Sequence, residues 1–206
     1  IVTGHAPGPL LAALASNPLA GRVREVSLNA VFKGLDENLT VASLALQGVF
    51  PGANQQEIAL SATAEGAEVA LARKTLAAPK VAFGVGALRG SSSLELVAEG
   101  DKARASGQLN VPPFDLRALL TALAMPLPAT RYPDTYTQVG LDTAFRADGS
   151  GFALGKLSAR VDATTITGSL EAADLALPDL RFNLSADRFD LDRYLPATAA
   201  SSPVNP

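Results

Sequence analysis

Apolar and polar residues alternate with a period of two along almost the whole chain, and no other feature of the sequence restricts its fold as much. The first clear stretch places Val26, Leu28, Ala30 and Phe32 on one side of an extended chain, with polar residues between them. Successive side chains of a β-strand point to opposite faces, so each such stretch predicts a strand with one apolar and one polar face. Similar stripes follow at residues 58–62, 81–85, 94–98, 103–111, 139–145, 157–161, 166–170 and 180–184.

Short turn signals separate these stripes and leave no space for helical crossovers between them. They are Gly34, Pro51-Gly52, Gly66, Gly90, Gly100-Asp101 and residues 148–151. Strands that follow one another through tight turns pair antiparallel, whereas parallel pairs need long crossover connections. The sequence therefore predicts an antiparallel meander.

Only two segments have apolar residues at helical spacing, residues 10–15 and 115–124. In the second, Asp115 is a candidate N-cap because its carboxylate can accept hydrogen bonds from the first free backbone amides. Pro126 and Pro128 end this helix, and the stretch that follows to Pro133 is predicted to be a linker.

These elements predict a mainly β fold, a long curved antiparallel sheet with one or two short helices. The chain has no Trp, eight Phe and three Tyr in 206 residues, so few large side chains are available to fill a core. The apolar face must be covered by the sheet curling on itself, by a second sheet or by a bound apolar ligand. An open groove and a partly closed, filled barrel or sandwich both satisfy this pattern.

We expect one β domain over residues 1–196 and a flexible tail over residues 197–206, because the tail is rich in Pro and Ser. A weak internal repeat relates residues 114–120 to residues 189–195, and residues 105–109 loosely to residues 166–170. Each copy of the first pair ends a series of predicted strands. Repeated hairpins that extend one sheet would produce this similarity.

Charge and composition exclude several classes of function. The 17 basic and 20 acidic residues are scattered, and no run of Lys or Arg is dense enough to follow a phosphate backbone, so we expect no nucleic-acid partner. The absence of Cys excludes disulfides and thiolate chemistry. No stretch approaches the ~20 consecutive apolar residues of a membrane-spanning helix. Because the chain starts at Ile1, we expect it to be an excised piece of a longer protein whose membrane anchor lies elsewhere.

Four candidate chemical sites have structural interpretations that fit better. His5, the single histidine, has no nearby acid to orient it. Residues 84–91 lack the lysine of a phosphate-binding loop and predict a strand end and a turn. Asp187, Asp190 and Asp192 lack the glycine and distal glutamate of a calcium loop and suit a strand edge or a helix cap. Residues 148–151 are typical of a hairpin turn. We therefore expect that the chain is not an enzyme and that it binds no metal ion and no cofactor.

Residues 104–196 resemble the AsmA family of bacterial envelope proteins. The matching pieces, in order, are residues 111–120, residues 125–128, the strand around Leu141, residues 165–170 and residues 189–196. The last piece, Phe-Asp-Leu-Asp-Arg-Tyr-Leu-Pro, is the most similar to the family. The chain departs from a complete member by lacking the amino-terminal membrane helix and most of the length.

The resemblance implies a periplasmic location, with the full-length protein anchored in the inner membrane. It also implies an elongated β-sheet whose apolar groove shields phospholipid acyl chains during transport between the membranes or outer-membrane assembly. The residues expected to line this groove are Phe32, Leu60, Phe83, Leu141, Phe145, Leu170 and Phe182. The alternative is a structural or protein-interaction module with a filled β core, which docks an envelope assembly protein through its strand edges or the helix at 115–124.

Overall fold

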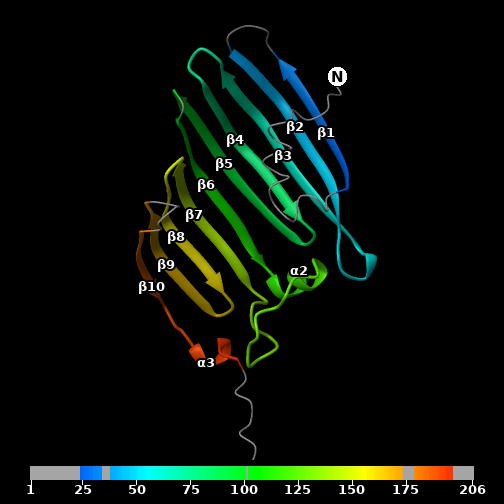
Figure 1. The fold of residues 1–206 in the computed structure, drawn as a ribbon, viewed down its shortest axis with the longest axis vertical. Helices are drawn as coiled ribbons and strands as arrows, with labels where there is room; N and C mark the ends of the chain where they lie inside the picture. Colours follow the sequence, from blue (N-terminus) through cyan, green and yellow to red (C-terminus); the bar gives the residue numbers. More distant parts are fainter. Residues whose placement is uncertain (1–23, 34–37, 101, 174–178, 197–206) are drawn as a thin grey trace, which may run out of the picture.

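A computed structural model of the chain describes residues 24–33, 38–100, 102–173 and 179–196. Ten strands form one antiparallel sheet in the order of the sequence, β1 to β10, which confirms the predicted meander (Figure 1). Nine of them contain the predicted stripes, and β2 is an additional strand. The strands are β1 Arg24–Lys33, β2 Asn38–Pro51, β3 Glu57–Ala70, β4 Thr75–Val85, β5 Leu88–Glu99, β6 Lys102–Phe114, β7 Val139–Asp148, β8 Phe152–Val161, β9 Thr164–Ala172 and β10 Leu180–Ala186. The helical elements are η2 Ala53–Gln55, α2 Leu116–Ala122 and α3 Leu191–Tyr194.

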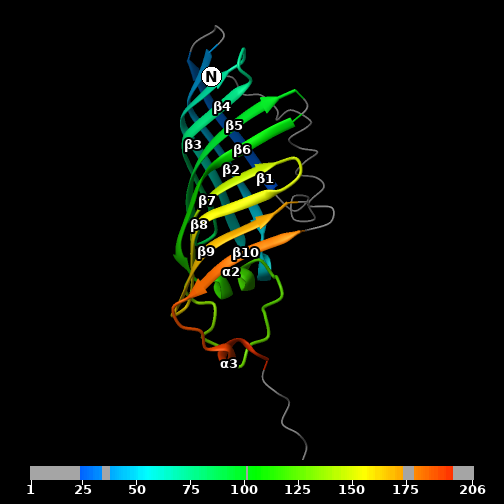
Figure 2. The ribbon, with the colours of Figure 1, turned by 90° about the vertical axis from the view of Figure 1, so that its left-hand side faces the viewer.

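The sheet is open and is not closed into a barrel. Its two edge strands, β1 and β10, each pair with one neighbour and not with each other. Figure 2 shows that β1 and β10 run in clearly different directions, because the strand direction turns progressively across the sheet. Right-handed twist of each strand produces this rotation. Of the predicted forms, the long curved antiparallel sheet is confirmed.

Cross-strand register sorts the side chains onto two faces, since directly paired residues point the same way. Pairs such as Ala62 with Phe83 and Leu141 with Ala159 carry the apolar stripe from strand to strand. Irregularities between Ala78 and Val81 and between Leu154 and Leu157 shift the alternation without moving the stripe to the other side. We call the side that carries the stripe the apolar face and the opposite side the polar face.

The helix predicted at 115–124 is confirmed as α2. Its N-cap is Asp115, whose Oδ1 accepts a hydrogen bond of 2.8 Å from the Ala118 backbone amide. Leu119 is buried and lies over the end of the apolar face, where a Cβ at Gly86 would be 3.6 Å from its Cδ1 and 3.2 Å from Ile58 Cγ2. The helix therefore covers one end of this face, above Phe50 and Ile58, which are 4% and 3% exposed.

The buried core is thin. Buried apolar residues of the described ranges are Val41, Phe50, Ile58, Ala67, Ala70, Ala78, Leu119 and Ala172. Half of them are alanines, so few large side chains are fully removed from water. One cluster joins Val41, Ala67 and Ala78 across β2, β3 and β4. Most large residues of the apolar face are only half-buried, as expected for a single layer.

Four sequence predictions lie outside the described residues: the helix at 10–15, the role of His5, the turn at Gly34 and the flexible tail at 197–206. The linker predicted up to Pro133 belongs to a loop that returns the chain from α2 to β7 within the same sheet. Thr135 in that loop is fully buried and shares a 2.7 Å hydrogen bond with Thr130. The loop is thus held by specific contacts.

The two copies of the internal repeat correspond in the structure at their helices, but their strand pieces occupy different positions in the sheet. Asp115 and Asp190 are N-caps of short helices that directly follow the last strands of their series, β6 and β10. The strand pieces do not correspond, because residues 105–109 lie in β6 while residues 166–170 lie in β9, one strand before β10. No helix in the described part of the chain is long and apolar enough to cross a membrane.

Candidate ligand-binding face

The structure brings all seven residues predicted to line a groove to the apolar face. Direct pairs place Leu60 opposite Val85, next to Phe83, and place Leu170 opposite Phe182. Phe32 and Phe182 lie on the two edge strands and are 48% and 69% exposed. The other five, which lie on inner strands, are half-buried. The seven residues therefore extend across the sheet from one edge to the other.

The apolar face carries no charge at its regularly paired positions. From Leu28 on β1 to Ala186 on β10, every Asp, Glu, Lys and Arg with a described partner in the register lies on the polar face. Two hydroxyl groups on the apolar face form hydrogen bonds with backbone carbonyl oxygens. Ser92 Oγ donates to Gln108 O at 2.7 Å, and Thr143 Oγ1 donates to Gly155 O at 3.1 Å. Both hydroxyl groups therefore use their hydrogen-bond donor within the sheet.

Two of the predicted lining residues also hold the sheet together. The ring of Phe83 occupies the space over Gly90, its cross-strand partner, where a Cβ would collide with it. Phe145 lies in the same way beside its partner Gly107, with Cε1 3.0 Å from the position of a Cβ there. An aromatic ring over a paired glycine shields backbone that would otherwise be exposed. Phe83 and Phe145 therefore pack against the sheet and do not project from it.

The largest hollow among the described residues does not lie on the apolar face. A hollow of about 170 Å³ on that face is lined by Val26, Leu46, Leu60 and Phe83. A larger one, about 780 Å³, lies over the polar face, and its lining mixes polar residues such as Glu95, Arg146 and Glu171 with apolar ones such as Ala77, Ala144 and Ala153. Ordinary ligand pockets enclose about 300–1,000 Å³. The apolar face is thus a broad, shallow surface.

Several apolar-face residues were missing from the predicted stripes. No stripe was predicted for β2, so Val41, Leu44 and Leu46 were missed with that strand. Ala67, Ala78 and Leu154 also belong to this face, but they lie beyond positions where the alternation shifts. Gly66, with φ +63°, marks such a position in β3. A glycine or proline inside a strand commonly signals a bulge. Gly66, Pro79 and Gly155 were the sequence signals that could have located these shifts.

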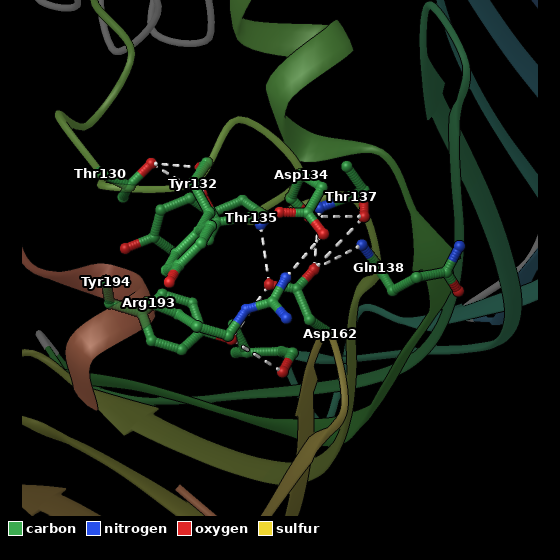
Figure 3. Close-up of polar contacts among 11 residues, drawn as sticks. Thr130, Tyr132, Asp134, Thr135, Thr137, Gln138, Asp162, Arg193 and Tyr194 are labelled. Atoms are coloured by element: carbon green, nitrogen blue, oxygen red, sulfur yellow. Dashed lines mark hydrogen bonds and ion pairs between the residues drawn. The ribbon is translucent and has the colours of Figure 1, made fainter. Parts of the chain in front are cut away.

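A second candidate site surrounds Asp162, in the two-residue turn between β8 and β9 (Figure 3). Its carboxylate accepts hydrogen bonds from the backbone amides of Tyr136, Thr137 and Gln138 at 2.8, 2.9 and 3.2 Å. It also accepts one from the Tyr194 hydroxyl at 3.0 Å. This carboxylate joins the loop before β7 to the carboxy-terminal helix α3.

Side chains around Asp162 strengthen the same connection. Arg193 forms a 2.8 Å ion pair with Asp134, and its guanidinium lies 5.7 Å from the Tyr132 ring centroid. The Tyr194 ring packs 5.4 Å from Tyr136. Among the described residues, every hydrogen-bond partner of Asp162 is a donor to its carboxylate. The cluster is therefore a structural connection, which the spacing of residues in the sequence did not predict.

The other candidate sites match their structural interpretations. Residues 84–91 form the end of β4, a turn with Gly86 at φ +58°, and the start of β5. Asp148 Oδ1 accepts from the Ser150 and Gly151 amides in the hairpin turn. Asp187 accepts from the Thr165 amide, and Asp190 is the N-cap of α3. Within the described residues no group of acidic or histidine side chains could hold a metal ion.

The ionisation of Asp162 predicts how stability depends on pH. Partial burial opposes ionisation, but the hydrogen bonds from Tyr136, Tyr194, Gln138 and Thr137 outweigh it and lower the pKa of Asp162 below its usual 3.8. A lowered folded-state pKa contributes stability above pH 3.8 that is lost as the pH falls through the folded value. We expect the Asp162→Asn variant to lose less stability than the native chain between pH 5 and pH 2, measured by urea unfolding at each pH.

The stability of the chain above pH 10 tests the hydrogen bond between Tyr194 and Asp162 independently. Burial and the hydrogen bond to Asp162 raise the pKa of Tyr194 to about 12 from its usual 10.0. Stability from this contact is complete below pH 10 and is lost as the pH rises toward 12. The Tyr194→Phe variant should lack that alkaline loss. Equal pH profiles for native chain and both variants would contradict the assigned contact.

No protein-family model, no curated protein and no solved structure matches this chain.

Proposed function

We propose that this chain is a periplasmic segment of an AsmA-like envelope protein, and that its apolar face shields phospholipid acyl chains. The observation that carries the proposal is an apolar face that has no charge at its regularly paired positions and extends over ten strands. Among the described residues, α2 covers one end of this face and no second layer covers the rest. Its exposed edge residues include Phe32, Leu180, Phe182 and Leu184. Contact with hydrocarbon would remove this surface from water, at about 25 cal/mol per Å² of apolar area.

The chemistry of the face suits acyl chains better than a protein partner. Protein interfaces combine an apolar centre with hydrogen bonds and a polar rim. Here the polar side chains Ser92 and Thr143 already donate to backbone carbonyls within the sheet. Acyl chains need only a continuous dry surface, and a broad shallow face can hold them without a deep pocket. The similarity of residues 104–196 to AsmA proteins supports a periplasmic location, with the full-length protein anchored in the inner membrane.

A second function is favoured by the edge strand β10. All seven of its residues are exposed, and among the described strands β9 alone pairs with it. An unpaired edge can accept a strand from another protein. In this alternative, the chain is a structural module that docks an envelope assembly protein, and the apolar residues of β10 contribute to that contact. The two functions differ in whether lipid remains with the purified chain.

The test is native mass spectrometry with lipid extraction of the chain purified without detergent from the periplasm or membranes. The paired changes Phe32→Glu and Phe182→Glu put a carboxylate at each edge of the apolar face. We expect them to lower the bound phospholipid per protein by at least about fivefold, since an unpaired charge against hydrocarbon is strongly unfavourable. These positions are better than Phe83 and Phe145, which pack over glycines and whose replacement would disturb the fold.

The matched control places the same charges on the polar face of the same strands, as Asn29→Glu and Asn183→Glu. Circular dichroism must show all variants folded. Phospholipid retained by the control and lost by the apolar-face variant is the expected result. A folded native chain that carries no phospholipid, or equal lipid in both variants, would reject acyl-chain shielding and leave the docking module.

A further inference from the structure

The two edges of the sheet differ in how well they are protected against pairing with another strand. At β1 the register has two irregularities, and Glu25 has φ +53°, so the row of hydrogen-bonding groups along this edge is disrupted. The register of β10 with β9 is regular from Leu180 to Ala186. Proline, lysine and bulges commonly protect an edge strand, and β10 contains none of them. β10 is therefore the open edge of the sheet.

Hydrogen bonds at the two ends of β10 show which of its backbone groups face outward. The Asp187 amide donates to Thr165 O at 3.1 Å, and the Ala173 amide donates to Asp179 O at 3.2 Å. Both pairs continue the register of β9 with β10. In an antiparallel ladder, pairs that exchange hydrogen bonds alternate with pairs that do not. The odd-numbered residues of β10 therefore bond to β9, and the outward backbone groups belong to Leu180, Phe182, Leu184 and Ala186.

The side chains of these four residues lie on the apolar face. Leu180, Phe182 and Leu184 are 56%, 69% and 46% exposed. Figures 1 and 2 show that α3 lies beyond the end of β10 and not beside it. A partner strand would thus complete the backbone hydrogen bonds and remove part of three large apolar side chains from water.

The length and register of β10 fit a second copy of the same strand. Antiparallel pairing of all seven residues places Asn183 opposite its own copy, at a two-fold axis. Phe182 then lies opposite Leu184 of the second copy. Leu180 lies opposite Ala186 in the same way. Each of these pairs has its outward backbone groups in the hydrogen-bonded position, so the ladder is satisfied over the whole strand.

The charges of β10 also permit this pairing. Arg181 is the single charged residue of the strand, and it lies opposite the uncharged Ser185 of the second copy. Its guanidinium group already forms a 2.7 Å ion pair with Asp179 of its own chain. Like charges directly opposite each other destabilise a strand pair, and none meet in this register.

We propose that two copies of the chain associate through β10 and form one continuous antiparallel sheet. The two-fold axis lies normal to the sheet, because that rotation reverses the strand direction and keeps each face on its own side. The two apolar faces therefore join into one wider surface. Pairing of β10 with β1 of another copy would instead give an open filament, which the irregular edge of β1 disfavours. The inference does not depend on lipid binding.

Sedimentation velocity of the full chain over a range of concentrations, without lipid or detergent, measures this association. Asn183→Lys places two lysines opposite each other at the two-fold axis, and we expect it to weaken the dimer at least about fivefold. An equimolar mixture of Asn183→Lys and Asn183→Glu should restore the dimer, because the opposed charges then attract. The matched control, Asn29→Lys, puts the same charge on the polar face of β1 and should leave the dimer unchanged. Circular dichroism checks that the variants fold.

Amide hydrogen exchange gives a second readout for the native chain. The amides of Phe182 and Leu184 should exchange more slowly as the concentration rises, whereas the Asn183 amide, which faces β9, should change less. A chain that is monomeric at every concentration would overturn the proposal. A dimer that Asn183→Lys leaves unchanged, or that Asn29→Lys weakens equally, would also overturn it. A monomer that still carries phospholipid would reject the dimer and keep the proposed function, and a lipid-free dimer would do the reverse.

Discussion

Replacing Gly107 with alanine is expected to lower the free energy of unfolding by about 2 kcal/mol, which for a chain of this size is a fall in Tm of roughly 4–8 °C. A Cβ at this position would collide with the Ser93 carbonyl oxygen on β5 and would come within 3.0 Å of the Phe145 ring on β7. Backbone cannot move aside as a flexible side chain can. β5, β6 and β7 would therefore have to separate or shift.

The matched control is Gly155→Ala in β8, where nothing lies within 4 Å of an added Cβ. That variant should unfold within about 0.5 kcal/mol of the native chain, because the methyl group meets open space. Urea unfolding followed by circular dichroism measures both. Equal stabilities for Gly107→Ala and Gly155→Ala would show that the ring of Phe145 and the strand β5 relax freely around residue 107, and that the close pairing described above does not constrain the sheet.

Removing the carboxylate of Asp162 is expected to have the second largest effect. Asp162→Gly leaves the amides of Tyr136, Thr137 and Gln138 and the Tyr194 hydroxyl without their shared acceptor. Glycine is the right replacement because residue 162 has φ +54°, where alanine would add backbone strain of its own. We expect a loss of about 2 kcal/mol, since these bonds are to a charged group but are partly reached by water.

Amide hydrogen exchange shows which part of the chain loses stability in the Asp162→Gly variant. The Leu116 and Arg117 amides donate to Tyr136 O, so the loop held by Asp162 also holds the start of α2. Faster exchange of the 136–138 and 116–117 amides in Asp162→Gly, with unchanged exchange in β2 to β5, is the expected pattern. Asp162→Asn retains a carbonyl oxygen and should lose about half as much. Uniformly faster exchange over the whole sheet would mean that Asp162 acts on global stability and does not join α3 to α2.

The strands were predictable because alternation is a local property of the chain. Val26 to Phe32, Val81 to Val85 and Val139 to Phe145 each place their apolar side chains on one side, whatever their neighbours are. Asp115 was likewise a local signal, since an N-cap needs only the amides of the following turn. Local order along the chain also predicted the meander, because turns of a few residues leave antiparallel pairing as the only choice.

The sequence by itself thus determined the mainly β fold, the antiparallel meander, α2 and the apolar-face residues of the nine predicted stripes, but not β2. Only the tertiary structure decided where the alternation shifts, which edges remain unpaired, and how Phe145 meets Gly107. It also brought Asp162 to Tyr194, 32 positions away, and left Arg117 beside the β2–β3 connection without a full set of partners. These features depend on contacts between residues far apart in the chain, and a pattern that repeats every two residues carries no information about such distances.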